Sequence, residues 1–224
     1  MSIDTYFGIG KPDEKKEITV KPALADIIFE PKAEKKLYTF DASLRVLRER
    51  SYERHPRPAE AFGLICNGLE GRLQPDQQAI ADEMIQEDGS EWLSMVMLRE
   101  GNLLHCYLDP ENLVWNGHKY VAQGGKLKHA GEEVYSIGSS IGSLRVWVPI
   151  KEVNEMNPAL VEKLWSRHYA ILPEEIRQNG RLWFPSENVL WPVGRLGYFD
   201  GKYIIGTVIG TYWDSSASRG VQQR

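Results

Sequence analysis

The chain has 224 residues, of which 42% are hydrophobic and 26% charged, and its formal net charge at pH 7 is -4. This size and composition are typical of a globular protein that forms a core without disulfides or metals, and they exclude global disorder. The acidic balance gives no overall attraction to polyanions, so a nucleic-acid partner would need a local basic patch and is not favoured.

Cysteine usage and hydropathy indicate the compartment. Cys66 and Cys106 are the two cysteines, and neither belongs to a C-x-x-C pair, which excludes a disulfide framework and a four-thiolate zinc site. No stretch of about 18 unbroken apolar residues occurs, and the first residues lack a basic start followed by an apolar core. We therefore expect a cytoplasmic protein with no membrane association.

Residues 1–37 are predicted to form an extended N-terminal arm. They carry seven lysines and seven acidic residues, and Pro12, Pro22 and Pro31 interrupt any helix. One short strand is expected around the letters DIIF. Because the charges balance, this arm favours local ion pairing over polyanion binding.

Three helices are predicted next. The first has Asp41 as its N-cap and an apolar face opposite a face of arginines, and it should end near His55 because Pro56 and Pro58 follow. The second begins at Pro58 and ends at Gly71, and the third begins at Pro75 and ends at Gly89.

From Glu91 onward the apolar pattern changes to that of strands. A hairpin is expected over residues 91–110, and Asn116-Gly117 and Asp200-Gly201 predict two more hairpin turns. Between them, a helix capped by Asn157 and a short helix ending at Gly180 form a helical hairpin. The last residues, DSSASRGVQQR, are interpreted as a polar tail that is either a recognition tail or a frayed end.

This order of elements predicts an α+β fold. It consists of the arm over residues 1–37 and a single α+β domain over residues 38–224, in which a three-helix segment precedes a mostly antiparallel β-sheet interrupted by the helical hairpin.

The strongest local charge signal is a group of arginines on and after the first helix. Five guanidinium groups within 13 residues could bind phosphates or carboxylates bidentately. The alternative is that these arginines lie on a solvated helical face and pair with the acidic helices that follow. The candidate binding residues are Arg45, Arg48, Arg50, Arg54 and Arg57.

Metal and catalytic signatures are weak. His105, Cys106, His118 and His129 lie in the β section, but their spacing matches no compact ligand pattern, and His168 is expected on the apolar stripe of a helix. We therefore expect no metal and no cofactor.

A nuclease constellation matches by residue type alone. Many metal-dependent nucleases hold Mg²⁺ with one acidic residue and a second acid that stands two positions before a lysine, and Glu187, Asp200 and Lys202 have these residue types. However, Asp200-Gly201 suits a hairpin turn better than a metal site. No Gly-x-Ser-x-Gly elbow and no phosphate-binding Gly-x4-Gly-Lys-Ser/Thr loop is present.

We predict a non-enzymatic binding or assembly protein that contacts a partner protein, or a second copy of itself, through the arginines of the first helix and the following turn. The alternative is a metal-dependent hydrolase or nuclease that uses Glu187, Asp200 and Lys202 or the histidines of the β section.

Overall fold

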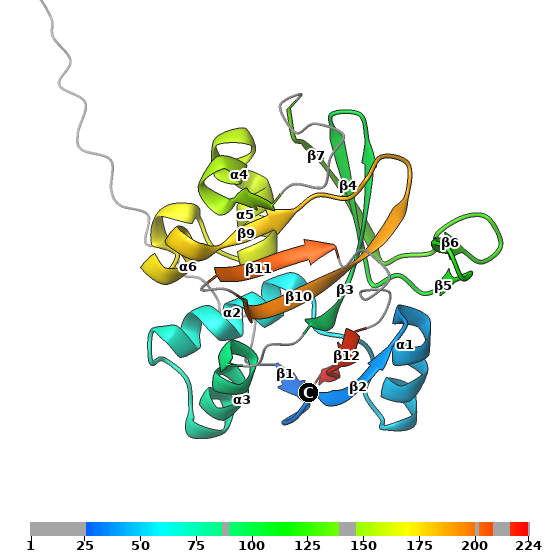
Figure 1. Ribbon diagram of the computed structural model, residues 1–224. Helices are drawn as coiled ribbons and strands as arrows, with labels where there is room; N and C mark the ends of the chain where they lie inside the picture. Colours follow the sequence, from blue (N-terminus) through cyan, green and yellow to red (C-terminus); the bar gives the residue numbers. More distant parts are fainter. Residues whose placement is uncertain (1–25, 87–89, 139–146, 200–201, 208–215, 224) are drawn as a thin grey trace, which may run out of the picture.

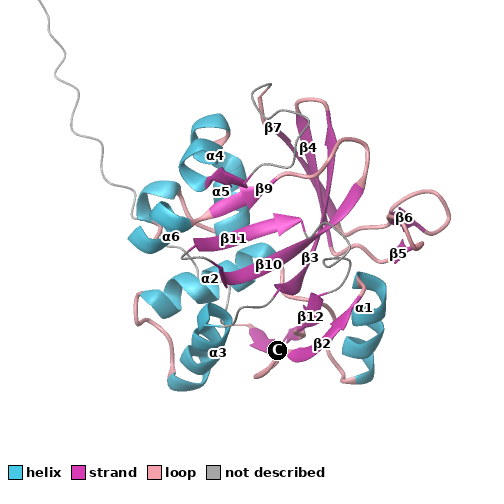
Figure 2. Cartoon of the chain, in the orientation of Figure 1, coloured by secondary structure: helices cyan, strands magenta, loops and turns pink. Residues whose placement is uncertain are grey.

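The fold was determined as a computed structural model, which describes residues 26–86, 90–138, 147–199, 202–207 and 216–223. It belongs to the α+β class, as predicted, with helices around a mostly antiparallel sheet (Figures 1 and 2). The helices are α1 (Phe40–Glu49), α2 (Pro58–Leu69), α3 (Pro75–Gln86), α4 (Ile150–Met156), α5 (Pro158–Trp165) and α6 (Glu174–Asn179), with a 3₁₀ turn at Tyr169–Ile171. Among the described residues, no helix is long and apolar enough to cross a membrane.

The centre of the sheet is made by long antiparallel strands. β3 (Ser90–Glu100) pairs with β10 (Leu190–Phe199) on one side and with β4 (Leu103–Leu108) on the other. β10 continues to β11 (Lys202–Thr207), and β4 continues to β7 (Gly131–Ser136). The predicted hairpin over residues 91–110 is therefore confirmed.

Shorter strands extend this sheet. β8 (Trp147–Pro149) pairs with β9 (Arg181–Trp183), which runs parallel to β11. β5 (Leu113–Trp115) and β6 (Tyr120–Ala122) form the second predicted hairpin. Its loop spans four residues and not two, because the Asn116 side chain accepts the backbone N–H groups of His118 and Lys119.

The predicted starts of α2, α3 and α5 are confirmed at Pro58, Pro75 and Pro158, and α6 lies within the predicted short helix. The predicted end of the third helix at Gly89 lies outside the described residues. α1 differs from its prediction at both ends. Thr39 is its N-cap and Asp41 lies in its first turn, and the helix ends at Glu49. The N–H groups of residues 50–52 still donate to carbonyls of α1, and the chain turns away at Ser51, whose φ is 68°. Glu53 and Arg54 then pair with another segment: Glu53 donates to the carbonyl of Val221, and Val221 donates to that of Arg54.

The hydrophobic core lies on both faces of β3. Alternate residues of a strand point to opposite faces, so Leu93 and Met95 join the larger cluster under α2, α4 and α5, whereas Trp92 and Val96 join a smaller one under α1. Figure 1 shows α1 on one side of the sheet and the other helices on the opposite side. The connection from α1 to α2 therefore passes along the edge of the central strands.

Both ends of the described chain enter the fold. The strand predicted around DIIF is confirmed as β1 (Ile27–Phe29), and a further strand, β2 (Glu34–Tyr38), follows it. β12 (Ser216–Ser218) pairs with β2 and β3, and β13 (Val221–Gln223) pairs with β1. Of the two alternatives for the last residues, a frayed end is wrong for residues 216–223, because Arg219 is fully buried and ion-paired.

Candidate functional site

An open cleft of about 760 Å³ lies where the connection between α1 and α2 meets the middle of β3 and the ends of β4 and α5. Three of the five predicted arginines, Arg48, Arg54 and Arg57, contribute to its lining. The cleft therefore contains the main part of the binding surface expected from the sequence.

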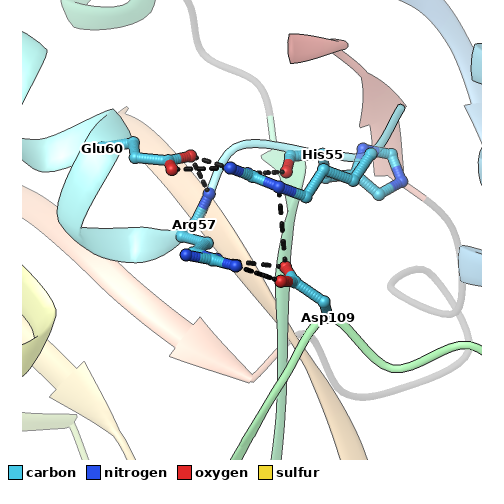
Figure 3. A network of polar contacts seen from close by, with 5 residues as sticks. His55, Arg57, Glu60 and Asp109 are labelled. Carbon is cyan, nitrogen blue, oxygen red and sulfur yellow. Dashed lines mark hydrogen bonds and ion pairs between the residues drawn. The ribbon is translucent and has the colours of Figure 1, made fainter. Parts of the chain in front are cut away.

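Arg54 and Glu60 form the inner ion pair of the cleft. Each terminal nitrogen of Arg54 donates to one carboxylate oxygen of Glu60 at 2.7 Å, and Nη1 also donates to the carbonyl of His55 at 3.0 Å (Figure 3). The Glu60 side chain is only 8% exposed, so this pair is held away from solvent. Glu60 also accepts the backbone N–H of Arg57 at 2.8 Å, which is the half of a capping box that an acid at the third helical position supplies; the Arg57 side chain has only donors and cannot supply the other half.

Arg57 and Asp109 form the outer pair. Nε of Arg57 donates to both carboxylate oxygens of Asp109 at 3.1 and 3.2 Å, and Nη2 makes a further short contact. Nε of Arg54 lies 3.8 Å from the same carboxylate, so the two pairs form one network, as Figure 3 shows.

The local sequence holds Arg57 in this position. Pro56 and Pro58 restrict the backbone on both sides, and Pro58 starts α2. The carbonyl of Pro56 accepts the N–H of Ser94 in β3, and the carbonyl of Ser94 accepts the N–H of Asp109 after β4. The first of these backbone hydrogen bonds connects the turn to β3, and the second connects β3 to Asp109.

Asp109 has a positive φ of 48°, a conformation that aspartate adopts more readily than most residues. Burial alone would raise the pKa of Asp109, but hydrogen bonds from Arg57 and Ser94 and the charges of Arg57 and Arg54 lower it below its ordinary value. The hydrogen bond to Asp109 in turn raises the pKa of Arg57. Arg57 and Asp109 are therefore both ionised at neutral pH.

The other predicted arginines lie outside the cleft. Arg45 is exposed and lies 3.6 Å from Asp41, one helical turn away. Arg50 points toward the first described strands, at 2.7 Å from Glu30 and 3.8 Å from Glu34. Arg48 is exposed at the cleft and makes no ion pair with a described residue.

Sequence reasoning missed the two acidic partners. Glu60 could have been found, since it stands three residues after Arg57 at the start of a helix, where an acid accepts the backbone N–H of the N-cap residue. Asp109 is 52 residues from Arg57 along the chain, and no local signal connects the two.

A serine–histidine pair lies behind the cleft. Oγ of Ser43 is 2.9 Å from Nε2 of His55, and Nδ1 of His55 is 3.3 Å from the carbonyl oxygen of Arg219. Burial lowers the pKa of His55 to about 3, so the ring is neutral at physiological pH. Both Ser43 and His55 are completely buried, and a substrate has no access to them in this conformation.

Two histidines of the β section, His105 and His129, lie on either side of Tyr107. His105 stacks on Tyr107, which contacts the ring of His129, and Nδ1 of His105 lies 2.9 Å from Glu132. His118 is apart from them in the exposed β5–β6 loop. Within the described ranges, no group of three or more His, Cys, Asp or Glu residues could hold a metal ion.

The remaining candidates have other surroundings. Cys66 and Cys106 are buried free thiols, and burial raises the pKa of each to about 12. His168 is half-exposed and precedes the 3₁₀ turn, so its prediction on a helical stripe is wrong.

The nuclease alternative stays untested. Glu187 lies 3.8 Å from Arg99, Asp200 falls outside the described residues, and only the backbone of Lys202 is described, at the start of β11.

The comparisons give no relative: no protein-family model, no curated protein and no solved structure matches this chain.

Proposed function

We propose that this is a non-enzymatic binding or assembly protein of the cytoplasm, and that a partner protein enters the cleft to contact Arg48, Arg54 and Arg57. The cytoplasmic location is supported by the two cysteines, which are both free thiols.

One observation carries the proposal: the guanidinium group of Arg57 is fixed but still accessible. Asp109 accepts from its Nε and Nη2, while the side chain stays 39% exposed, and Nη1 has no acceptor among the described residues. An arginine that is already ordered loses little rotamer entropy when it binds, and arginine is enriched among the residues that dominate protein interfaces. Arg57 therefore suits the role of an anchor for a carboxylate or carbonyl of the partner.

The charge of the cleft favours a protein over a nucleic acid. The basic lining residues are Arg48, Arg54, Arg57 and Lys163, and the acidic ones are Asp26, Glu53, Glu60, Asp109, Glu111 and Glu162. A polyphosphate backbone would meet more negative than positive charge here, whereas a folded protein surface can present both signs. The mixed charge also gives specificity, because a partner of the wrong pattern is repelled.

The test compares two arginines on the same helix. Arg48 lines the cleft and Arg45 does not, yet both are exposed. Partners captured by the tagged full-length protein would be identified, and their affinities measured by calorimetry with the purified proteins. We expect Arg48→Glu to weaken binding at least tenfold and Arg45→Glu to change it less than twofold.

Circular dichroism and thermal unfolding would confirm that both variants are folded. If both charge reversals had the same effect on affinity, or neither had any, the cleft would not be the contact surface.

A further inference from the structure

Residues 216–223, which we name the Arg219 segment, lie in a slot whose contacts depend on the side chains of the segment. The slot is formed by β1, by residues 50–54 after α1, and by acidic side chains from α3 and β3. The slot borders the cleft, because Ile27, Glu53, Arg54 and Gln223 also line the cleft and Val221 pairs with the backbone of Arg54.

Arg219 is the anchor of the segment. Its side chain is fully buried, and it donates to the carbonyl of Glu30 at 2.7 Å and to the carboxylates of Glu83 at 2.8 Å and Glu91 at 3.1–3.3 Å. These three acceptors lie in different directions around one planar group. A guanidinium can satisfy them together, whereas an ammonium group lacks the fixed, planar arrangement of five donors.

Gly220 adds a steric requirement. A Cβ atom at this position would lie 2.3 Å from Cγ of Tyr52, which is closer than real Cβ atoms come to other atoms. The N–H of Gly220 donates to the Glu30 carboxylate at 2.8 Å, and its carbonyl accepts from the N–H of Glu30 at 2.8 Å. The slot therefore accepts glycine after the arginine and excludes larger residues.

Val221 completes the recognition through its backbone. It pairs with Phe29 of β1 on one side and with Arg54 on the other, and its side chain is 1% exposed. A strand that gains main-chain hydrogen bonds on both edges and places single side chains in pockets is bound as peptides are in β-augmentation.

We propose that this slot is a peptide-binding site for an extended Arg-Gly-Val sequence, and that the Arg219 segment of a second copy of the chain occupies it by strand exchange. Eight residues, 208–215, connect the segment to β11 along the chain. A second copy carries the same segment and can make the same contacts, which is the basis of domain swapping. This proposal is independent of the function assigned to the cleft.

The test traps exchange with a disulfide between two chains. Ile28 and Gln222 are directly paired residues of β1 and β13, and both are accessible, with Ile28 36% exposed. Full-length Ile28→Cys is mixed with full-length, affinity-tagged Gln222→Cys under mild oxidation. The two cysteines meet in register only when the segment of one copy enters the slot of the other, and the native thiols are buried.

The control pair is Ile28→Cys with Gln178→Cys, because Gln178 is exposed on α6 and outside the slot. The chain's own segment competes at an effective concentration of about millimolar, but oxidation is cumulative, so the linked dimer builds up with time. We expect at least tenfold more mixed disulfide dimer than in the control pair. A yield equal to the control would overturn the proposal.

Sequence specificity is tested in the same mixture with synthetic peptides at about millimolar concentration. A peptide with the sequence of residues 217–223 should lower the yield of mixed dimer about twofold, because it fills the slot in competition with the chain's own segment at a similar concentration. The same peptide with Arg219→Ala should leave the yield unchanged, and an equal effect of both peptides would contradict recognition of the arginine.

Discussion

The guanidinium of Arg54 and the carboxylate of Glu60 meet through two parallel hydrogen bonds of 2.7 Å at the inner wall of the cleft. This pair also connects the turn after α1 to the first turn of α2, because the same carboxylate caps the helix at Arg57. Its removal should therefore affect stability as well as binding.

Glu60→Ala should lower the free energy of unfolding by about 3 kcal/mol, since it leaves a mostly buried guanidinium without its partner and removes a helix cap. Urea denaturation at pH 7 measures this loss. Asp76→Ala is the matched control, because Asp76 is an exposed acid in the first turn of α3. The control should lose less than about 1 kcal/mol, and equal losses in both variants would show that the ion pair contributes nothing specific.

Asp109→Asn should destabilise the protein by about 2 kcal/mol at pH 7, because it weakens charged hydrogen bonds while asparagine still tolerates the positive φ. The pKa of Asp109 is lowered in the folded state, so its contribution to stability is present above its ordinary pKa of 3.8 and is lost as pH falls below that value. The stability difference between wild type and variant, measured by urea denaturation, should therefore shrink between pH 5 and pH 3. A difference that stays constant over this range would argue against an ionised Asp109.

His55 gives a second pH dependence at higher pH. The unfolded chain protonates His55 below about pH 6.5, whereas burial lowers the pKa in the folded chain to about 3. The unfolded state therefore binds more protons in this window, and stability falls as pH drops through it, by about 1.4 kcal/mol per pH unit.

His55→Gln should remove this part of the pH dependence, since glutamine does not titrate. The free energy of unfolding of wild type and variant would be compared at pH 7, 6 and 5. His118→Gln, at an exposed loop position, should leave the slope as in wild type. A steep slope that persists in His55→Gln would locate its origin elsewhere.

Gly220→Ala should lower the free energy of unfolding by about 2 kcal/mol or more, because the new methyl group collides with Tyr52. Gly131→Ala provides the control: its nearest contact would be Leu108 Cδ1 at 3.9 Å, and we expect a change within about 0.5 kcal/mol. Thermal unfolding followed by circular dichroism compares the two. Similar melting temperatures for both variants would mean that the slot can widen at no cost.

Local sequence signals predicted much of the fold correctly. Pro58, Pro75 and Asn157 mark the starts of helices because their effect on the backbone acts within one or two residues. The alternating pattern after Glu91 likewise identified the β3–β4 hairpin, since side chains alternate between faces in any strand. The same signals failed at the end of α1, where Val221, about 170 residues away, competes for the backbone of Glu53 and Arg54.

The sequence by itself determined the α+β class, the helix starts and the concentration of arginines between Arg45 and Arg57. Only the tertiary structure decided that Arg54 and Arg57 face a cleft while Arg50 stabilises the first strands, and that Arg219 is buried and not part of a frayed tail. The physical reason is that backbone preferences act between neighbours in the chain. The position of a charged side chain depends instead on which opposite charge the folded chain brings within a few ångströms, and Asp109 and Glu91 are distant in the sequence from the arginines that they bind.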